Sequence, residues 1–148
     1  MNGVFKISEA ASLAMHTMVY LASHPNGPVT AKEIAAVFPI SEAHLAKVLQ
    51  RLVKSGLVRS TRGPRGGFEL ALPAEKMTLL EIFETIEGPI NGGGCLLGEG
   101  GCFGASCILG DLVGMVNREV RDFLNHNTLA KVGQVFNGGN HEQAASHN

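Results

Sequence analysis

The apolar positions in the first third of the chain recur with the period of an α-helix. Residues 8–22 contain no glycine or proline and carry a broad apolar stripe, which predicts a buried first helix. A second helix is expected to begin at a capping-box pattern on Thr30 and to end at Pro39. Ser41 then caps a third helix that runs to about Ser55, with apolar residues on one face and polar residues on the other. Two short helices joined by a tight turn are typical of a helix-turn-helix.

The period changes after Gly56, which is expected to end the third helix in a left-handed conformation. Residues 57–62 and 68–72 alternate apolar and polar positions around a Gly/Pro tip that carries Arg65, and this pattern predicts a β-ribbon, or wing. Residues 78–86 again show helical spacing behind a capping box.

The remainder of the chain is first irregular and then helical. Nine glycines fall within the 23 residues 88–110, and an apolar stripe then recurs at helical spacing to about Asn125. The predicted class is mainly α (α+β): a winged helix-turn-helix with a two-stranded β wing and a long C-terminal dimerisation helix. The expected parts are a DNA-binding domain at 1–87, a Gly/Cys loop at 88–110, dimerisation helices at 107–136 and a disordered tail at 137–148.

The charge is distributed unevenly. The net charge is −1, yet six of the twelve Lys and Arg residues lie between Ala43 and Phe68 with no acid among them, so the rest of the chain carries six bases and thirteen acids, or −7. One positive surface on an acidic body is the pattern expected of a face that binds phosphates, and it predicts double-stranded DNA as the partner. The predicted DNA contacts are Ser41, His44, Lys47, Gln50, Arg51, Lys54, Arg59, Arg62 and Arg65.

Different roles are expected within this set. The Lys and Arg residues other than Arg51 would mainly neutralise phosphates, whereas His44, Gln50 and Arg51 could contact base edges. The arginines at the wing tip fit a narrow minor groove.

Three cysteines lie in the glycine-rich segment. Cys95, Cys102 and Cys107 have six and then four residues between them, and the glycines around them leave backbone amides unobstructed. Three thiolates on such a loop could hold an iron–sulfur cluster. A zinc site with three cysteines and a histidine, a thiol switch between Cys102 and Cys107, and incidental cysteines are the alternatives. An odd number of cysteines does not make a closed disulfide framework.

A fourth ligand would have to come from elsewhere. His16 and Glu9 on the first helix are the leading candidates, and the further candidates are Ser12, Glu99 and Asp111. The apolar stripe of the long helix predicts a seam between two copies of the chain on a two-fold operator, although the same stripe could pack back on its own domain.

Several stretches resemble the IscR/NsrR/CymR-type winged-helix regulators, the Rrf-two family. The matching segments, within residues 6–136, are 18–22, 40–41, 52–58, the wing at 62–68 and the three cysteines before a long helix. The resemblance implies a homodimeric regulator of transcription whose three cysteines, here Cys95, Cys102 and Cys107, ligate a 2Fe–2S or 4Fe–4S cluster.

The resemblance also bears on the fourth ligand. Some members use a histidine at the position that Gly110 occupies here, so that ligand is absent. Others take a histidine or a carboxylate from the first helix of the partner subunit, and these two positions match His16 and Ser12.

The function expected from the sequence is a DNA-binding transcriptional regulator, a repressor, that senses redox state, nitric oxide or iron–sulfur status through this cluster. The alternative is a cluster-free regulator that responds to a metabolite or to thiol oxidation. No general-base constellation or nucleotide-binding loop supports an enzyme. No apolar run approaches the roughly 18–20 residues of a membrane span and no signal peptide is evident, so a cytoplasmic protein is expected.

Overall fold

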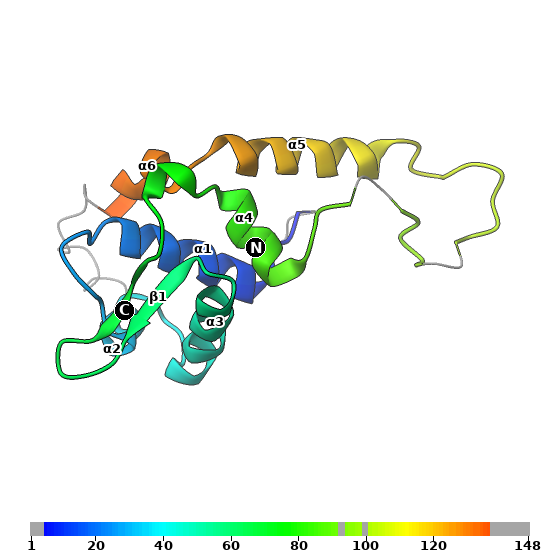
Figure 1. Ribbon diagram of the computed structural model, residues 1–148. Coiled ribbons are helices and arrows are strands. Elements are labelled where there is room, and N and C mark those ends of the chain that lie inside the picture. Colours follow the sequence, from blue (N-terminus) through cyan, green and yellow to red (C-terminus); the bar gives the residue numbers. More distant parts are fainter. Residues whose placement is uncertain (1–4, 92–93, 99–100, 137–148) are drawn as a thin grey trace, which may run out of the picture.

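The computed structural model describes residues 5–91, 94–98 and 101–136. Helix α1 (Glu9–Ala22) runs through the centre of the molecule, with α2 (Ala31–Val37), α3 (Glu42–Lys54) and α4 (Leu79–Glu87) arranged around it (Figure 1). The seven buried residues of α1 are Ala11, Leu13, Ala14, Thr17, Met18, Val19 and Leu21. The predicted buried first helix is therefore confirmed.

The helix ends lie where the capping residues predict them. The hydroxyls of Ser8, Thr30 and Ser41 each accept a hydrogen bond from the first turn of the helix that follows. At Thr30 the capping box is complete, because the carboxylate of Glu33 also accepts the Thr30 amide at 2.7 Å. This bond holds the pKa of Glu33 below its ordinary value, since the charged carboxylate is the better acceptor.

Strands β1 (Val58–Thr61) and β2 (Gly67–Leu70) form the wing, an antiparallel pair in which Val58 faces Leu70 and Thr61 faces Gly67. The wing is attached to the body through Val29, which exchanges two backbone hydrogen bonds with Phe68 at 2.8 and 2.9 Å. Only glycine fits at Gly67: its φ is +148°, and an added Cβ would lie 2.6 Å from the Val29 carbonyl oxygen.

Two short 3-10 turns and two further helices complete the described part of the chain. They are η1 (Ala74–Lys76) before α4, then α5 (Leu112–His126), α6 (Leu129–Val132) and η2 (Gly133–Phe136) after the cysteine loop. The chain returns to its own domain after α5, because Leu129 is fully buried in the same core as α1 and its amide donates to the Met77 carbonyl.

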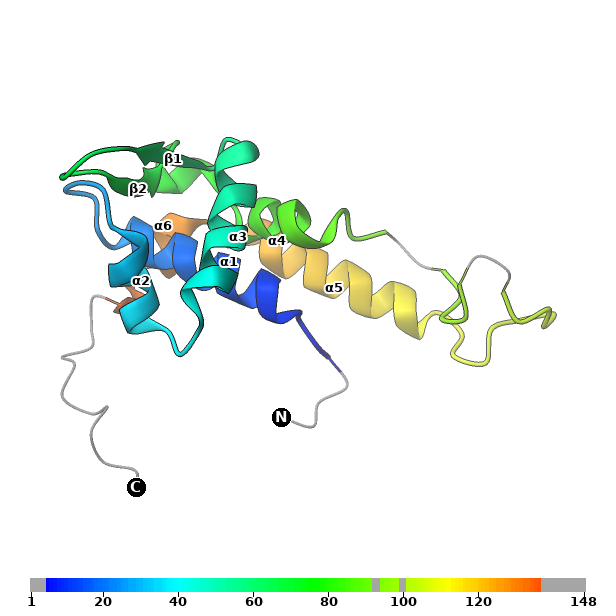
Figure 2. The same ribbon diagram turned by 90° about the horizontal axis from the view of Figure 1, so that it is seen from below.

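Helix α5 is the element that leaves the body. It lies along α4 at its C-terminal half, and its N-terminal end projects beyond the domain and carries the cysteine loop there in both views (Figures 1 and 2). The long predicted helix is confirmed, beginning at Leu112 rather than near Leu109. Gly110, with a φ of +56°, lies in the turn before it. The predicted tail at 137–148 lies outside the described residues.

Candidate DNA-binding face and cysteine loop

Helix α3 has the two faces that its sequence predicts. Its inner face is buried through Leu45, Val48, Leu49 and Leu52. The opposite face therefore meets solvent, and Lys47, Gln50 and Lys54 are exposed on it. The first turn carries one acid and the last turn two bases, an arrangement that complements the helix dipole.

A groove joins this face to the wing. It has a volume of about 470 Å³ and lies between α3 and β1–β2, with Leu49, Val53 and Phe68 among its apolar lining residues. Gln50, Lys54 and Arg62 also line it, so the structure brings together side chains from the helix and the wing that are up to 12 positions apart in the sequence. Lys54 and Arg62 thus place two cationic side chains beside one groove, an arrangement that attracts anions such as phosphates.

The cationic side chains of the wing, Arg59, Arg62 and Arg65, are exposed on its surface. Arg62 and Arg65 are exposed at the tip between the strands. Arg59 lies lower on β1 and donates from Nε to the carboxylate of Glu69 at 3.0 Å. That carboxylate offsets part of the Arg59 charge, so the unpaired positive charge of the wing lies mainly at its tip.

Three predicted DNA contacts also bind within the protein. The Ser41 hydroxyl accepts the His44 amide at 3.2 Å, and Nδ1 of His44 lies 3.5 Å from the carboxylate of Glu9. Arg51 is turned toward α4, where Nη2 donates to the Ile86 carbonyl at 2.6 Å and to the Thr85 carbonyl at 3.2 Å. In this geometry the guanidinium of Arg51 is engaged with α4, and the base contact expected of it stays a prediction. Its partners lie 34 and 35 residues away, so no local pattern indicates them.

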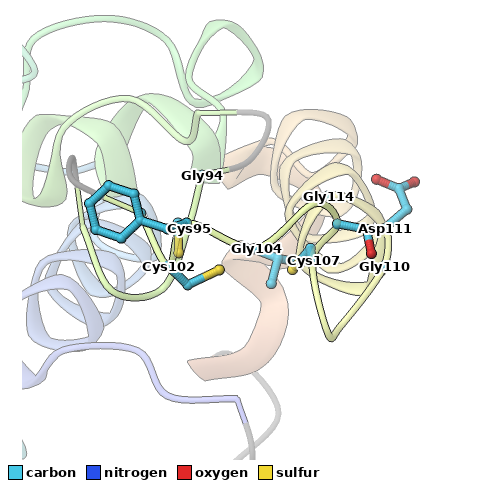
Figure 3. Close-up of a pocket in the computed structure, with 12 residues that line it drawn as sticks. Gly94, Cys95, Cys102, Gly104, Cys107, Gly110, Asp111 and Gly114 are labelled. Atoms are coloured by element: carbon cyan, nitrogen blue, oxygen red, sulfur yellow. The ribbon is translucent and has the colours of Figure 1, made fainter.

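The three cysteines lie around one hollow at the outer end of α5. All three are exposed and unpaired, and they line a cavity of about 440 Å³ together with Asp111, Gly114 and several loop residues (Figure 3). Gly104 lines this space, and a Cβ there would lie 3.1 Å from the Ser106 carbonyl oxygen and 3.4 Å from Sγ of Cys102. The loop thus has the room beside its sulfurs that a bound inorganic group requires.

The donor set fits an iron–sulfur cluster or zinc in kind. Three soft thiols on a permissive backbone match the ligands that both groups prefer. Within 5–91, 94–98 and 101–136, however, no group of three or more His, Cys, Asp or Glu side chains converges as a metal-binding set. Asp111, one of the candidate fourth ligands, is paired instead with Arg118 at 2.7 Å. Glu99 lies outside the described residues.

The first-helix candidates lie in a separate hollow on the body. Glu9, Ser12 and His16 line it together with Phe38 and other apolar residues, in a volume of about 400 Å³. Nδ1 of His16 lies 2.7 Å from the Ser12 carbonyl oxygen. A carbonyl oxygen can only accept, so Nδ1 is the donor in this contact and Nε2 takes no part in it.

These two hollows are far apart within one chain. The cysteine loop is beyond the end of α5, whereas the N-terminal end of α1 lies against the domain (Figures 1 and 2). The hollow with His16 and Glu9 and the hollow with the three cysteines have no lining residue in common.

Helix α5 has two kinds of apolar residue. Leu124 is buried and Val120 is half-buried in the half of α5 that lies along α4, whereas Val113 is half-buried beside the cysteine hollow. A second set stays exposed along the helix and just before it: Leu109, Leu112, Met115, Val116 and Phe123. The apolar stripe predicted as a seam is therefore divided, with one part packed on its own domain and the other part facing solvent.

Comparisons with known proteins agree with this architecture. Residues 7–134 match the model of the Rrf2 family, described as iron-dependent transcriptional regulators. The chain belongs to the Rrf2 family. It is 30% identical over 128 residues to the HTH-type transcriptional regulator IscR of Erwinia tasmaniensis, covering 86% of this chain and 78% of that protein.

Solved structures confirm the winged-helix fold. CymR of B. subtilis, titled a global cysteine regulator, superposes with a TM-score of 0.76 at 28% identity, covering 89% of this chain and 98% of the other. IscR of T. potens superposes with a TM-score of 0.71 at 26% identity over 97% of this chain and 95% of that chain. The Rrf2 protein described here is thus a transcriptional regulator and not an enzyme. In the described part of the chain, none of the helices combines the length and the apolar character needed to cross a bilayer.

Proposed function

We propose that this Rrf2 protein is a homodimeric repressor whose affinity for a two-fold operator is set by an iron–sulfur cluster on Cys95, Cys102 and Cys107. The observation that carries the proposal is the cavity those cysteines line at the end of α5, next to the exposed apolar face of that helix. A cluster there would supply a centre that reacts with oxidants or nitric oxide and that ties three points of the loop together when bound.

In this proposal a second copy of the chain supplies the fourth cluster ligand, which the cysteine loop of one chain lacks. Met115, Val116 and Phe123 are 50%, 42% and 65% exposed, which leaves an apolar face for pairing with the same face of a second copy. Pairing through α5 would carry each loop to the other subunit, where the hollow with His16 and Glu9 opens. His16, whose Nε2 takes no part in the contact with Ser12, is then the favoured fourth ligand and Glu9 the second choice.

The DNA-binding part follows from the positive surface. Lys47, Lys54, Arg62 and Arg65 would bind phosphates on each half-site, and Gln50 would reach base edges from the outer face of α3. Because each loop is held between two subunits, its state would set the spacing of the two recognition helices. A regulator of this kind acts where the chromosome is, so the cytoplasm is its proposed location.

The first experiment measures iron, acid-labile sulfide and visible absorbance of protein purified without oxygen. Cys102→Ala should abolish the absorbance, whereas Ser106→Ala, in the same loop but without a sulfur ligand, should retain it. Unchanged absorbance in Cys102→Ala would contradict the assignment. Iron-free wild-type protein would favour the alternative, a regulator that responds to thiol oxidation, which the exposure of all three cysteines supports.

A mixed dimer tests whether the site is shared. One subunit carries Cys102→Ala and the other His16→Ala, and two different affinity tags select the mixed species. If each cluster takes His16 from the partner, one of the two sites stays intact and the dimer holds about half of the wild-type iron. If each chain supplies its own histidine, both sites are broken and the iron is lost.

A further inference from the structure

The last turn of α4, residues 84–87, is the place where three other parts of the molecule meet; we call it the α4 junction. Arg51 of α3 donates to the carbonyls of Thr85 and Ile86. The hydroxyl of Ser8, the cap of α1, donates to the carboxylate of Glu87. Helix α3 and the cap of helix α1 therefore both form hydrogen bonds with the last turn of α4.

The bonds from Arg51 have a clear physical cause. The last carbonyls of a helix have no partner within the helix and carry partial negative charge, so a guanidinium is well placed there. Helix α4 ends at Gly88, whose φ of +83° turns the chain away and leaves these carbonyls accessible. Arg51 uses the same nitrogen for both bonds, at 2.6 and 3.2 Å, so its donors point toward α4.

The other side of the junction faces the cysteine loop. The carboxylate of Glu84 accepts from Nη1 of Arg121 on α5 and from the amide of Ile90, each at 3.1 Å. Arg121 also donates to the Ile90 carbonyl at 3.3 Å, and Asn117 donates to the Asn91 carbonyl at 2.9 Å. The segment that enters the loop is thus held by both α4 and α5.

We propose that Arg51 is a positioning residue of the DNA-binding face, and that the α4 junction transmits the state of the cysteine loop to helix α3. The path runs from residues 90–91 through Glu84 and Arg121 to the last turn of α4, and from there through Arg51. The transmission part rests on the proposed function. The role of Arg51 does not, because it is argued only from the bonds of Arg51 to α4 and from no contact with the cysteine loop.

Salt dependence separates a positioning residue from a phosphate contact. Each phosphate contact contributes about one unit to the slope of log K against log salt. Arg51→Met is compared with Lys47→Met, an exposed cation on the same helix. Both are measured on an operator selected with the wild-type protein and on a random duplex, over a range of salt.

Arg51→Met should weaken operator binding about tenfold, near the lower end of the effect of losing one charged hydrogen bond, because both bonds come from a single nitrogen. The salt slope and the random-duplex affinity should be unchanged. Lys47→Met should lower the slope by about one on both duplexes. A fall in slope for Arg51→Met equal to that for Lys47→Met would show a phosphate contact and overturn the positioning role.

Arg121→Gln tests the far side of the junction. This side chain is 49% exposed on α5, so its replacement leaves the core intact even if Arg51→Met proves unstable. The variant should retain the cluster's absorbance. Its ratio of operator affinities, cluster-loaded to cluster-free protein, should be at least threefold smaller than the wild-type ratio. A wild-type ratio in Arg121→Gln would refute transmission. If the wild-type protein binds the operator equally well with and without its cluster, the proposed function is refuted, and the salt test of Arg51 still applies.

Discussion

Replacing Phe123 by alanine tests the pairing of two chains through α5. Phe123 is 65% exposed in the single chain, near the C-terminal end of the helix and far from the cysteine loop. Burying a whole Phe side chain contributes about 1.5–3 kcal/mol, so burying the part that is exposed here contributes ~1–2 kcal/mol. A two-fold interface buries Phe123 of both subunits, so the variant loses ~2–4 kcal/mol of dimerisation free energy. The dimer dissociation constant should therefore rise roughly 30- to 700-fold.

Sedimentation velocity over a range of protein concentrations measures this constant directly. Asn125→Ala, an exposed polar position two residues away, is the matched control and should leave the constant unchanged. The thermal unfolding of the isolated chain should change little, because the Phe123 ring contributes mostly exposed surface there. Equal dissociation constants for Phe123→Ala, Asn125→Ala and wild type would refute the interface, as would a wild type that is monomeric at micromolar concentration.

Three further changes test the DNA-binding unit. Gly67→Ala should unfold or detach the wing at a cost of about 1–3 kcal/mol, seen as a lower melting temperature, because its Cβ would collide with the Val29 carbonyl; an unchanged melting temperature would contradict this contact. Thr30→Ala should cost about 1 kcal/mol in a denaturant titration, and an unaltered midpoint would show that the capping box is not stabilising. Glu33→Gln should remove a stabilisation that is present at neutral pH and lost as the pH falls through the lowered pKa of Glu33, below its ordinary 4.5; identical acid limbs for variant and wild type would refute it.

Local patterns account for most of the fold. The caps at Thr30 and Ser41 and the glycine at Gly56, with a φ of +80°, mark boundaries through interactions within a few residues, so the sequence alone predicts them. The wing is predicted for the same reason. Its attachment to Val29 is not, because that bridge joins segments about 40 residues apart.

The candidate site likewise has features that the sequence predicts and features that depend on tertiary packing. Exposure of Lys47, Gln50 and Lys54 follows from the helical period once the apolar face of α3 is recognised. The orientation of Arg51 toward α4 and the ion pair of Glu84 with Arg121 depend on the packing of α3, α4 and α5, with partners 34 to 37 residues apart, and no periodicity encodes them.

The division of the α5 stripe illustrates a further limit of periodicity. Val120 and Phe123 follow the same helical spacing in the sequence, yet one is half-buried on the domain and the other exposed. Periodicity identifies an apolar surface, whereas the element that covers it is decided by tertiary packing. One part of the stripe therefore packs on its own domain, and the exposed part is the surface that we propose for the pairing of two chains.

The most direct measurement is the operator affinity of one oxygen-free preparation before and after its cluster is removed by chelation. We expect iron and sulfide on the wild-type protein and a change in operator Kd of roughly 5- to 150-fold on their removal, the range expected for coupled sites. A colourless, iron-free protein from strictly anoxic cells, or equal Kd values before and after removal, would contradict it.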